Sequence, residues 1–436
     1  MAILIIFNLL IFTKLLLFWL WLWQLKEYHL GRFFAHFEAQ AFRKIISSFW
    51  RIKYPKFTKK IIVILLASLS LAFILAIKGY YLYIYFLIIF VPLVFQIPTV
   101  LWRKRYLNKA KKKRESFKNL LVIGITGSYG KTSTKEFLYT ILAEKFGKEK
   151  ILKTKEHQNS EVGISQCILS DLTAEHEIFI CEMGAYGRGG IKLLCDIVKP
   201  KIGILTGINE QHMATFGSLK NIIKTKYELI ESLPKDGIAF FNTKNKYCLE
   251  LYQKTPQRSL GLSFLYGAEA RVFGEENLLG AMAAAKKLGM TEEEISRAVS
   301  KIKNKLPGIQ SRKGINGITI FDATYSANPD SVIGHLEYLE ALPGRKIIIM
   351  PCLIELGKAS VEIHRKIGKK IAEVCDLAII TTKDRFQEIK EGAGEKAILL
   401  ENPKEIFEKI KSFCKSGDII LLESRVPAQL IKQLFL

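Results

Sequence analysis

Residues 124–134 read Gly-Ile-Thr-Gly-Ser-Tyr-Gly-Lys-Thr-Ser-Thr, after an apolar run and before a helical pattern. A buried strand, a glycine turn and a helix N-terminus together form a cradle for phosphate. Glycine lets backbone N–H groups approach the anion, and the helix end adds partial positive charge. Lys131 would reach the β- and γ-phosphates, and the hydroxyl of Thr132 or Ser133 would hold Mg²⁺. This stretch therefore predicts a nucleotide-binding α/β domain.

The stretch departs from the strict phosphate-loop pattern G-x-x-x-x-G-K-[ST], because Ile125 stands where the first glycine belongs. The alternative interpretation is a glycine-rich turn that binds nothing. The Gly-Lys-Thr-Ser order, placed between a strand and a helix, favours the nucleotide site.

Long apolar segments lie in the first quarter of the 436-residue chain. Residues 61–77 and 80–102 carry no charged side chain, and residues 2–23 carry only Lys14. A helix needs about 20 apolar residues to cross a bilayer, so we expect three membrane helices at these positions. A cleaved signal peptide is the alternative for the first segment. It fits poorly, because a basic region and a small-x-small cleavage site are missing.

Positive charge gathers beside the apolar segments. Residues 1–118 hold 20 lysine and arginine residues against 3 acidic residues, so they carry +17 of the net charge of +24. The basic stretches 24–60 and 103–118 flank apolar segments, and the positive-inside rule places both in the cytoplasm. Such stretches attract anionic lipid headgroups. Nucleic acid is the alternative partner, and the position beside the membrane argues against it. We expect a multi-pass protein of the inner (cytoplasmic) membrane with its catalytic domains in the cytoplasm.

Strands and helices alternate from residue 119 onward. Short β-branched runs predict strands at 120–125, 177–182, 201–206, 237–241, 317–321, 346–350, 377–381, 397–400 and 418–422, with a helical hairpin at 276–304. This alternation is typical of parallel βαβ units in doubly wound sheets. The expected α/β organisation is a transmembrane region at 1–102, a basic linker at 103–118, a P-loop parallel-sheet ATPase domain at 119–305 and a Rossmann-like C-terminal domain at 306–436.

Polar residues follow several predicted strands, where parallel sheets carry their sites. Glu182 ends one strand and is well placed to hold Mg²⁺; a solvent-facing glutamate is the alternative. His212 follows the next strand and could bind a second metal ion, or serve a structural role. Lys226 lies on a predicted helix and, taken alone, resembles any surface lysine. The polar loop 322–331 is either a substrate-binding loop or an ordinary Asn-Pro turn.

Several motifs, in their order, resemble the Mur ligase family, the ATP-dependent amide-forming enzymes of cell-wall peptide synthesis. The family's own phosphate loop is T-G-x-x-G-K-T-S/T, which explains Ile125. The other matching pieces are Lys153-Thr154, Asn159–Gly163, Glu182–Ala185, Phe216–Leu219, Lys226–Leu229, Tyr325–Pro329, Glu355–Gly357 and His364. The similarity covers residues 119–436 and is greatest to the branch that adds D-alanyl-D-alanine.

The resemblance implies a two-step reaction. ATP phosphorylates a carboxylate of a cell-wall precursor peptide, and the amine of an amino acid or dipeptide then displaces phosphate. Positive charge must gather where negative charge develops. The catalytic residues implied by the resemblance are Lys131, His212 and Lys226. The residues that would contact ATP are Thr126, Gly127, Ser128, Gly130, Lys131, Thr132, Ser133, Asn159, Asn277, Asp322, Tyr325 and Asn328.

The resemblance also implies two Mg²⁺ sites. Thr132 and Glu182 would serve one ion, and His212 the second. Lys226 matches the lysine that CO₂ can carbamylate in family members. A carbamate is an anionic oxygen ligand, so Lys226 would then belong to the metal site.

The chain departs from the family pattern at several places. Glu276 replaces the histidine of G-x-H-N, the loop beginning at Asp322 lacks one aspartate and one asparagine, and Ile309 stands where an arginine is expected. Three membrane helices take the place of the soluble domain that grips the UDP-sugar. The acceptor is therefore either UDP-linked and held by another protein, or lipid-linked and delivered along the membrane. The alternative functions are a ligase for another envelope or poly-γ-glutamate-like polymer, and a non-catalytic ATP-binding membrane scaffold.

Overall fold

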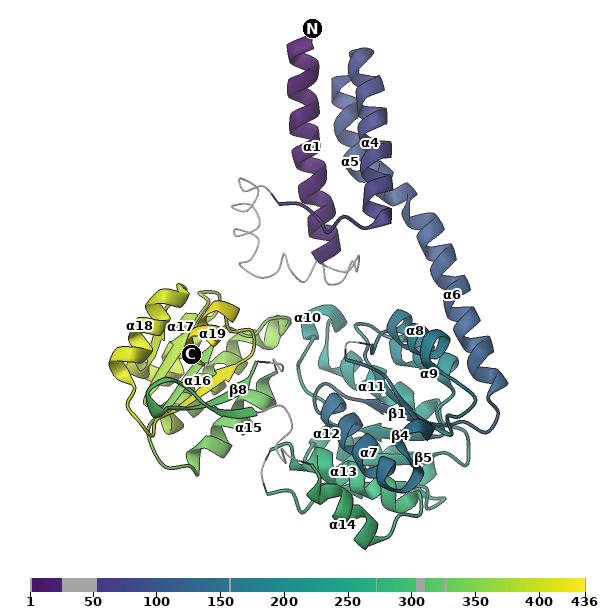
Figure 1. Ribbon diagram of the computed structural model, residues 1–436, viewed down its shortest axis with the longest axis vertical. Coiled ribbons are helices and arrows are strands. Elements are labelled where there is room, and N and C mark those ends of the chain that lie inside the picture. The colour runs from purple at the N-terminus through teal and green to yellow at the C-terminus, as the bar shows by residue number, and fades with distance from the viewer. Residues whose placement is uncertain are drawn as a thin grey trace. The chain divides into compact units, whose positions relative to one another are not determined.

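The computed structural model describes residues 2–25, 53–156, 158–271, 273–302, 310–324 and 328–435. The chain divides into two compact units, one ending at Asn108 and the other beginning at Lys109. Figure 1 shows helices alone in the first unit and two sheets with their helices in the second.

The first unit consists of apolar helices. The helices are α1 (Ala2–Leu25), α4 (Lys59–Ile77), α5 (Tyr81–Val94) and the first part of α6 (Gln96–Ser116). Among the described residues, three helical segments are long and apolar enough to cross a membrane: Ile3–Gln24, Lys59–Ile77 and Tyr81–Ser116. A buried seam joins α1, α4 and α5 through Phe12, Leu16, Ile64 and Ile84.

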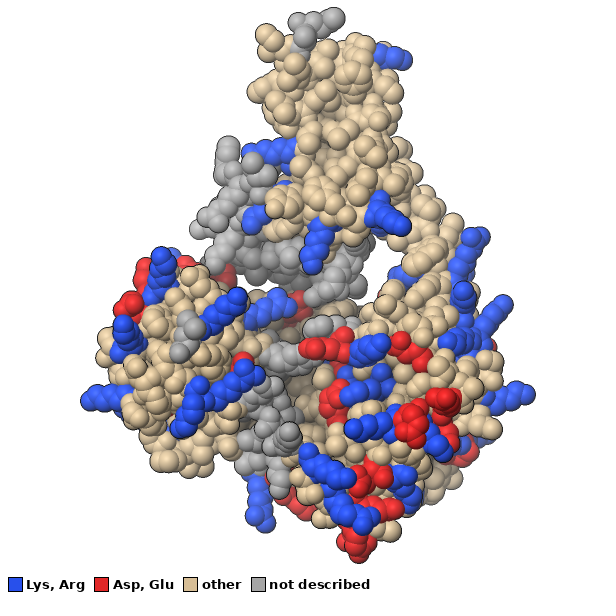
Figure 2. Space-filling model, in the orientation of Figure 1, with Lys and Arg blue, Asp and Glu red and all other residues tan. Residues whose placement is uncertain are grey.

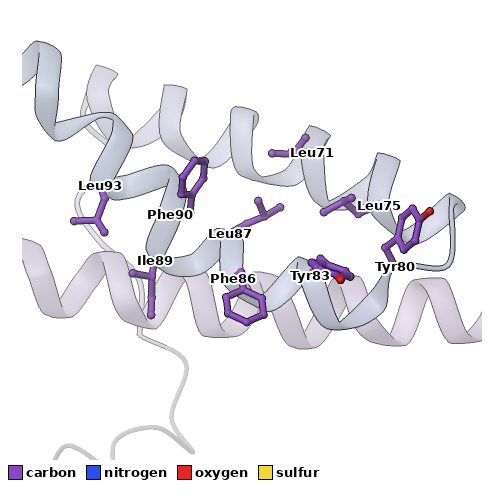
Figure 3. A pocket seen from close by; sticks show the side chains of 9 residues that line it. All are labelled: Leu71, Leu75, Tyr80, Tyr83, Phe86, Leu87, Ile89, Phe90 and Leu93. Atoms are coloured by element: carbon purple, nitrogen blue, oxygen red, sulfur yellow. The ribbon is translucent and has the colours of Figure 1, made fainter.

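The outer surface of these helices is apolar as well. Figure 2 shows mostly uncharged residues on the visible face of this unit. An apolar pocket of about 820 Å³ lies between α4 and α5. Figure 3 shows its lining side chains, which include Leu75, Tyr83, Phe86 and Phe90. Apolar surface of this extent is unfavourable in water and suits a lipid environment.

The predicted helices 2–23 and 61–77 are confirmed by α1 and α4. The third predicted span, 80–102, lies almost wholly within the candidate span Tyr81–Ser116, which is divided into α5, ending at Val94, and α6, starting at Gln96. Pro92 lies inside α5, and proline removes a helical hydrogen bond and crowds the preceding turn. The stretch 103–118 is also more regular than a linker, because α6 continues through its basic residues to Ser116.

The first sheet of the second unit has six parallel strands in the order β2-β3-β1-β4-β5-β6. The strands are β1 (Leu121–Thr126), β2 (Ile151–Lys153), β3 (Ile178–Met183), β4 (Ile202–Leu205), β5 (Ile238–Asn242) and β6 (Ser263–Tyr266). The helices are α7 (Lys131–Phe146), α8 (Glu161–Asp171), α9 (Gly190–Val198), α10 (Met213–Phe216), α11 (Leu219–Glu231), α12 (Lys246–Lys254), α13 (Glu275–Lys287) and α14 (Glu292–Ser300).

The alternation of side chains along the central strand explains the two layers of helices. Ile123 and Ile125 of β1 join a core with α7, α13 and α14. On the other face, Gly124 leaves room for Leu229 of α11, since a β-carbon there would lie 2.8 Å from the leucine Cδ1. The sheet is thus buried on both faces, as parallel sheets are.

The second sheet has six strands in the order β11-β10-β9-β12-β8-β7, and only β7 runs antiparallel to its neighbour. The strands are β7 (Gln310–Lys313), β8 (Thr319–Ala323), β9 (Lys346–Met350), β10 (Leu377–Ile380), β11 (Ala397–Leu399) and β12 (Ile419–Glu423). The helices are α15 (Pro329–Glu340), α16 (Ser360–Val374), α17 (Phe386–Ala393), α18 (Pro403–Phe413) and α19 (Ala428–Leu434), with the short helix η4 at Gly357–Ala359. Helices α15, α16 and α17 share one core with the sheet, and α18 and α19 share another.

All nine predicted strands form, although several begin later than predicted: β1, β3, β4, β5 and β12 by one residue and β8 by two. The prediction missed β2, β6 and β7. All three are short and lie at a sheet edge, where pairing rather than local composition decides the conformation. The hairpin at 276–304 is confirmed by α13 and α14. The predicted domain boundary at 305–306 lies outside the described residues and stays a prediction.

Candidate functional site

The candidate site lies at the carboxyl ends of β1, β3 and β4. Strand β1 pairs with β3 on one side and with β4 on the other, although β2 follows it in the chain. The connection after β1 runs to β2 on one side of the sheet, and the connection after β4 runs to β5 on the other. Doubly wound sheets bind ligands at such a reversal of direction.

The loop after β1 has a shape that only glycine allows. Gly130 has φ +79° and precedes α7, and a β-carbon there would lie 2.2 Å from Asn277 Oδ1. A β-carbon on Gly127 would lie 2.1 Å from Thr206 Oγ1. The loop leads directly into the N-terminus of α7, whose free amide groups and dipole favour an anion. This geometry is that of the predicted phosphate cradle.

Neighbouring segments hold the loop in place. Ser128 donates its backbone N–H to Gly207 O at 2.6 Å and accepts from the Asn209 N–H at 3.2 Å. Thr126 Oγ1 donates to Met183 O at 2.9 Å. These hydrogen bonds connect the segments at the carboxyl ends of β1, β3 and β4 to one another.

Lys131 folds back over the loop. Its Nζ donates to Gly127 O at 2.9 Å and to Ser128 O at 3.2 Å. Burial lowers the pKa of Lys131, and the charge of Glu182 opposes this effect. The ammonium group is therefore held at the cradle, where phosphate oxygens are its natural partners.

Glu182 lies at the centre of a polar cluster. Its carboxylate accepts from Thr132 Oγ1 at 3.0 Å and from Asn159 Nδ2 at 3.1 Å, and it lies 3.2 Å from Lys135 Nζ. Burial alone would raise the pKa of Glu182, but the charges of Lys131 and Lys135 and these hydrogen bonds hold it below its ordinary value. Glu182 is thus a carboxylate at neutral pH.

The donors around Glu182 fit one Mg²⁺ ion. A carboxylate and a hydroxyl are hard oxygen ligands, which this ion prefers. In the part of the chain that the structure describes, no group of three or more histidine, cysteine or acidic side chains could hold a metal. A nucleotide-bound Mg²⁺ would take most of its ligands from phosphate and water, with Thr132 and Glu182 as the protein ligands.

The expectation that Lys226 resembles a surface lysine is wrong. Lys226 is only 3% exposed and lies on α11. Burial, together with the nearby charge of Lys131, lowers its pKa to about 7. Helical periodicity points this residue inward, into a polar site rather than an apolar core.

His212 lies in the same electrostatic environment. Burial lowers its pKa, an effect that contact with Glu355 opposes and that the charges of Lys226 and Lys131 support. His212 Nδ1 contacts Glu355 Oε2, and its ring stands edge-on to Tyr186 with centroids 5.3 Å apart. Lys131, His212 and Lys226 therefore share one site.

The other predicted site residues make contacts of their own within the two α/β domains. Asn277 accepts from Thr134 Oγ1 at 3.3 Å and lies against the phosphate loop. Asn328 accepts from Asn209 Nδ2 at 3.2 Å. Asp322 makes a local turn, accepting from the Thr324 N–H and Oγ1 at 3.0 and 2.6 Å. Tyr325 lies outside the described residues.

Sequence reasoning assigned no role to three residues of this region. Lys135 pairs with Glu182, Asn209 also donates to Asp330 at 2.9 Å, and Glu355 contacts His212. Lys135 sits one helical turn after Lys131, and this spacing was the one available signal. The contacts of Asn209 and Glu355 join segments more than 100 residues apart, so no local pattern reveals them.

Comparison with known proteins agrees with this geometry. A model of the Mur ligase middle domain matches residues 125–311, and a model of the Mur ligase, glutamate ligase domain matches residues 309–425. The UDP-N-acetylmuramoyl-tripeptide–D-alanyl-D-alanine ligase of Synechocystis is 29% identical over 297 residues, which cover 62% of this chain and 61% of that relative. The ligase of the same name from Bacillus subtilis is 27% identical over 338 residues, 70% of this chain and 72% of the relative.

Solved structures show the same fold. The MurF ligase from Thermotoga maritima, in complex with ADP, superimposes with a TM-score of 0.65 and 24% identity, over 76% of this chain and 83% of that one. With a phosphate loop, two matching domains and MurF relatives, the chain belongs to the Mur ligase family and is of the MurF type.

Proposed function

We propose that the chain is an ATP-dependent ligase that forms an amide bond through an acyl phosphate. It adds D-Ala-D-Ala, or a similar amine, to a peptidoglycan precursor peptide at the cytoplasmic membrane. The observation that carries this proposal is that Thr132 bonds to Glu182 beside the phosphate loop while Lys131, His212 and Lys226 influence one another's charge. The names of the relatives and the ADP complex support the substrates and the nucleotide.

Each residue has a separate task in this reaction. The phosphate loop binds the triphosphate, and Lys131 neutralises charge on the phosphoryl group as it moves to the acceptor carboxylate. Thr132 and Glu182 would hold one Mg²⁺, and His212 with Lys226 a second. Bound Mg²⁺ would neutralise the phosphate oxygens and align them with the carboxylate. The amine then attacks the acyl carbon, and phosphate leaves with the bonding electrons.

Lys226 suits carbamylation. The reaction needs a neutral amine, which forms a bond to the CO₂ carbon and loses a proton. Burial lowers the pKa of Lys226 to about 7, so much of this lysine is neutral at physiological pH. The carbamate would add an oxygen ligand beside His212, in a site otherwise rich in positive charge.

The apolar helices support action at a membrane. Within the described residues, three helical segments are long and apolar enough to span a bilayer. The +17 charge of residues 1–118 would favour anionic headgroups on the cytoplasmic side. Attachment would raise the local concentration of a lipid-linked acceptor. We therefore favour a membrane-anchored ligase with its α/β domains in the cytoplasm.

The test is phosphate release from ATP by the detergent-solubilised chain. The reactions contain D-Ala-D-Ala with a UDP-linked muramyl tripeptide, its lipid-linked counterpart, or no acceptor. Release with either acceptor above the acceptor-free rate supports the ligase. Release with the lipid-linked form alone assigns the membrane helices to acceptor delivery. Extension of polyglutamate or free amino acids alone would instead favour a different polymer, and no release with any acceptor would favour a scaffold.

A further inference from the structure

The contact between His212 and Glu355 joins the two α/β domains. His212 follows β4 of the first sheet, and Glu355 lies between β9 and η4 of the second. The two residues are 143 positions apart in the chain, and their side chains meet through His212 Nδ1 and Glu355 Oε2. Both side chains are largely shielded from solvent, at 27% and 18% exposed.

Backbone geometry builds this contact on both sides. His212 has φ +66° and Glu355 has φ +65°, a left-handed conformation that is uncommon and strained outside glycine. The Ala214 N–H donates to Glu355 O at 3.1 Å. A β-carbon on Gly357 would lie 3.2 Å from the Ala214 nitrogen. Backbone contacts between the two segments therefore fix the positions of His212 and Glu355, in addition to the contact between their side chains.

The charges around the pair indicate that Glu355 orients the His212 ring. Lys226 and Lys131 face His212 with positive charge, and Glu355 is the acidic group that contacts the ring. A carboxylate on Nδ1 holds a histidine ring in one orientation and one tautomer, and leaves Nε2 to bind a metal. Such partners commonly change metal affinity by 10- to 100-fold.

We propose that Glu355 is a positioning residue for His212, and that it makes the second metal site depend on docking of the C-terminal domain. This inference rests on the proposed function, because it assigns His212 to a metal. Closure of the domain would deliver the carboxylate, orient His212 and complete the site in one movement. Phosphoryl transfer would then be confined to the closed state, in which water is excluded.

The competing explanation is that the pair only holds the domains together. A second contact separates the two cases, since Asn209 Nδ2 donates to Asp330 Oδ2 at 2.9 Å without involving His212. Replacing Asp330 weakens docking alone, whereas replacing Glu355 weakens docking and releases the histidine ring. Glu362 is exposed on the same domain and provides a neutral control.

The experiment measures Mn²⁺ binding by electron paramagnetic resonance. The full chain in detergent is titrated with Mn²⁺ in bicarbonate buffer and a non-hydrolysable ATP analogue. We expect Glu355→Gln and Glu355→Gly to weaken the second Mn²⁺ site by about 10- to 100-fold. Glu355→Asp should retain part of the affinity, and Glu362→Ala all of it. Asp330→Ala should change it less than threefold.

The glycine variant separates orientation from strain. Glycine adopts a φ of +65° without cost, so Glu355→Gly should unfold at or above the wild-type temperature while still losing Mn²⁺. Mn²⁺ affinity within twofold of wild type in both Glu355 variants would overturn the inference and leave the ligase proposal intact. An equal loss in Asp330→Ala would also overturn it, in favour of docking alone. Failure of the wild type to bind Mn²⁺ with the nucleotide would overturn the proposed function and this inference together.

Discussion

Lys135 Nζ lies 3.2 Å from the Glu182 carboxylate, and both side chains are nearly inaccessible to solvent, at 1% and 7% exposed. Lys135 occurs on α7 one turn after the phosphate-loop lysine, so the helix that begins the cradle also supplies a permanent counter-ion to its carboxylate. Lys135 and Lys131 together hold the pKa of Glu182 below its ordinary value in a buried site, so Glu182 keeps a counter-ion on α7 when Lys131 turns to phosphate.

Loss of Lys135 should therefore destabilise the first α/β domain. Removing one partner of a buried ion pair costs about 3–5 kcal/mol because the remaining charge is uncompensated. For Lys135→Met we expect about 2–4 kcal/mol, since Lys131 still faces Glu182. Thermal unfolding of the chain in detergent measures it, with exposed Lys148→Met as the control. The double variant Lys135→Met/Glu182→Gln should lose less than the two single changes combined, and simple additivity would contradict direct coupling.

Lys131→Ala should abolish ATP turnover without unfolding the protein. The glycines and the bonds of Ser128 set the loop conformation, so the lysine contributes charge rather than shape. Loss of one preorganised charge-stabilising group commonly lowers kcat by about 10²–10³-fold. Phosphate release and thermal unfolding are measured side by side, with Lys148→Ala as the matched control. Turnover within a few-fold of wild type would refute the phosphate-loop assignment.

Carbamylation of Lys226 makes activity depend on CO₂. Wild-type turnover should fall in degassed, bicarbonate-free buffer and return when bicarbonate is added, whereas Lys226→Ala should be inactive in both. The measurement is phosphate release at fixed pH and ionic strength. Equal turnover with and without bicarbonate would show that the free lysine is sufficient.

The same lysine should impose a pH dependence on stability. Its pKa is about 7 in the folded protein and 10.5 in an unfolded chain. Between these values the folded state binds fewer protons, so stability relative to the non-titrating Lys226→Met variant should rise with pH. Below about pH 7 the full penalty of burying the ammonium remains. Unfolding temperatures from pH 6.5 to about 10, in CO₂-free buffer, test this, and a flat or falling difference would contradict a buried neutral lysine.

Arg114 should anchor the last turn of α6 to the first α/β domain. Its guanidinium is buried and donates to Val198 O at 2.5 Å and to Lys199 O at 3.3 Å, at the C-terminus of α9. Arg114→Ala leaves these carbonyls without the cation, at a cost of about 1–3 kcal/mol. Thermal unfolding should show this loss, and exposed Lys112→Ala should show none. An unchanged unfolding temperature for Arg114→Ala would mean that water replaces the guanidinium at no cost.

Local patterns in the chain predicted much of this protein. Apolar length and charge asymmetry predicted the helices that could enter a membrane, and the nine main strands followed from short β-branched runs. Residues 124–134 predicted the phosphate loop. The places of Glu182 and His212 after strands made both residues candidates, and the family resemblance implied their metal-binding roles. These features depend on residues that are neighbours in the sequence, so local residue preferences and periodicity are sufficient to predict them.

Only the tertiary structure decided how these residues work. The burial of Lys226, the pairing of Lys135 with Glu182 and the contact of Glu355 with His212 arise from elements that meet after folding. A lysine on an amphipathic helix looks alike whether it faces water or a polar crevice, because its sequence neighbours are the same in both cases. The sequence thus determined which chemical groups are present and where each strand ends. Folding determined their burial and partners, and therefore their charge, because both depend on contacts between segments far apart in the chain.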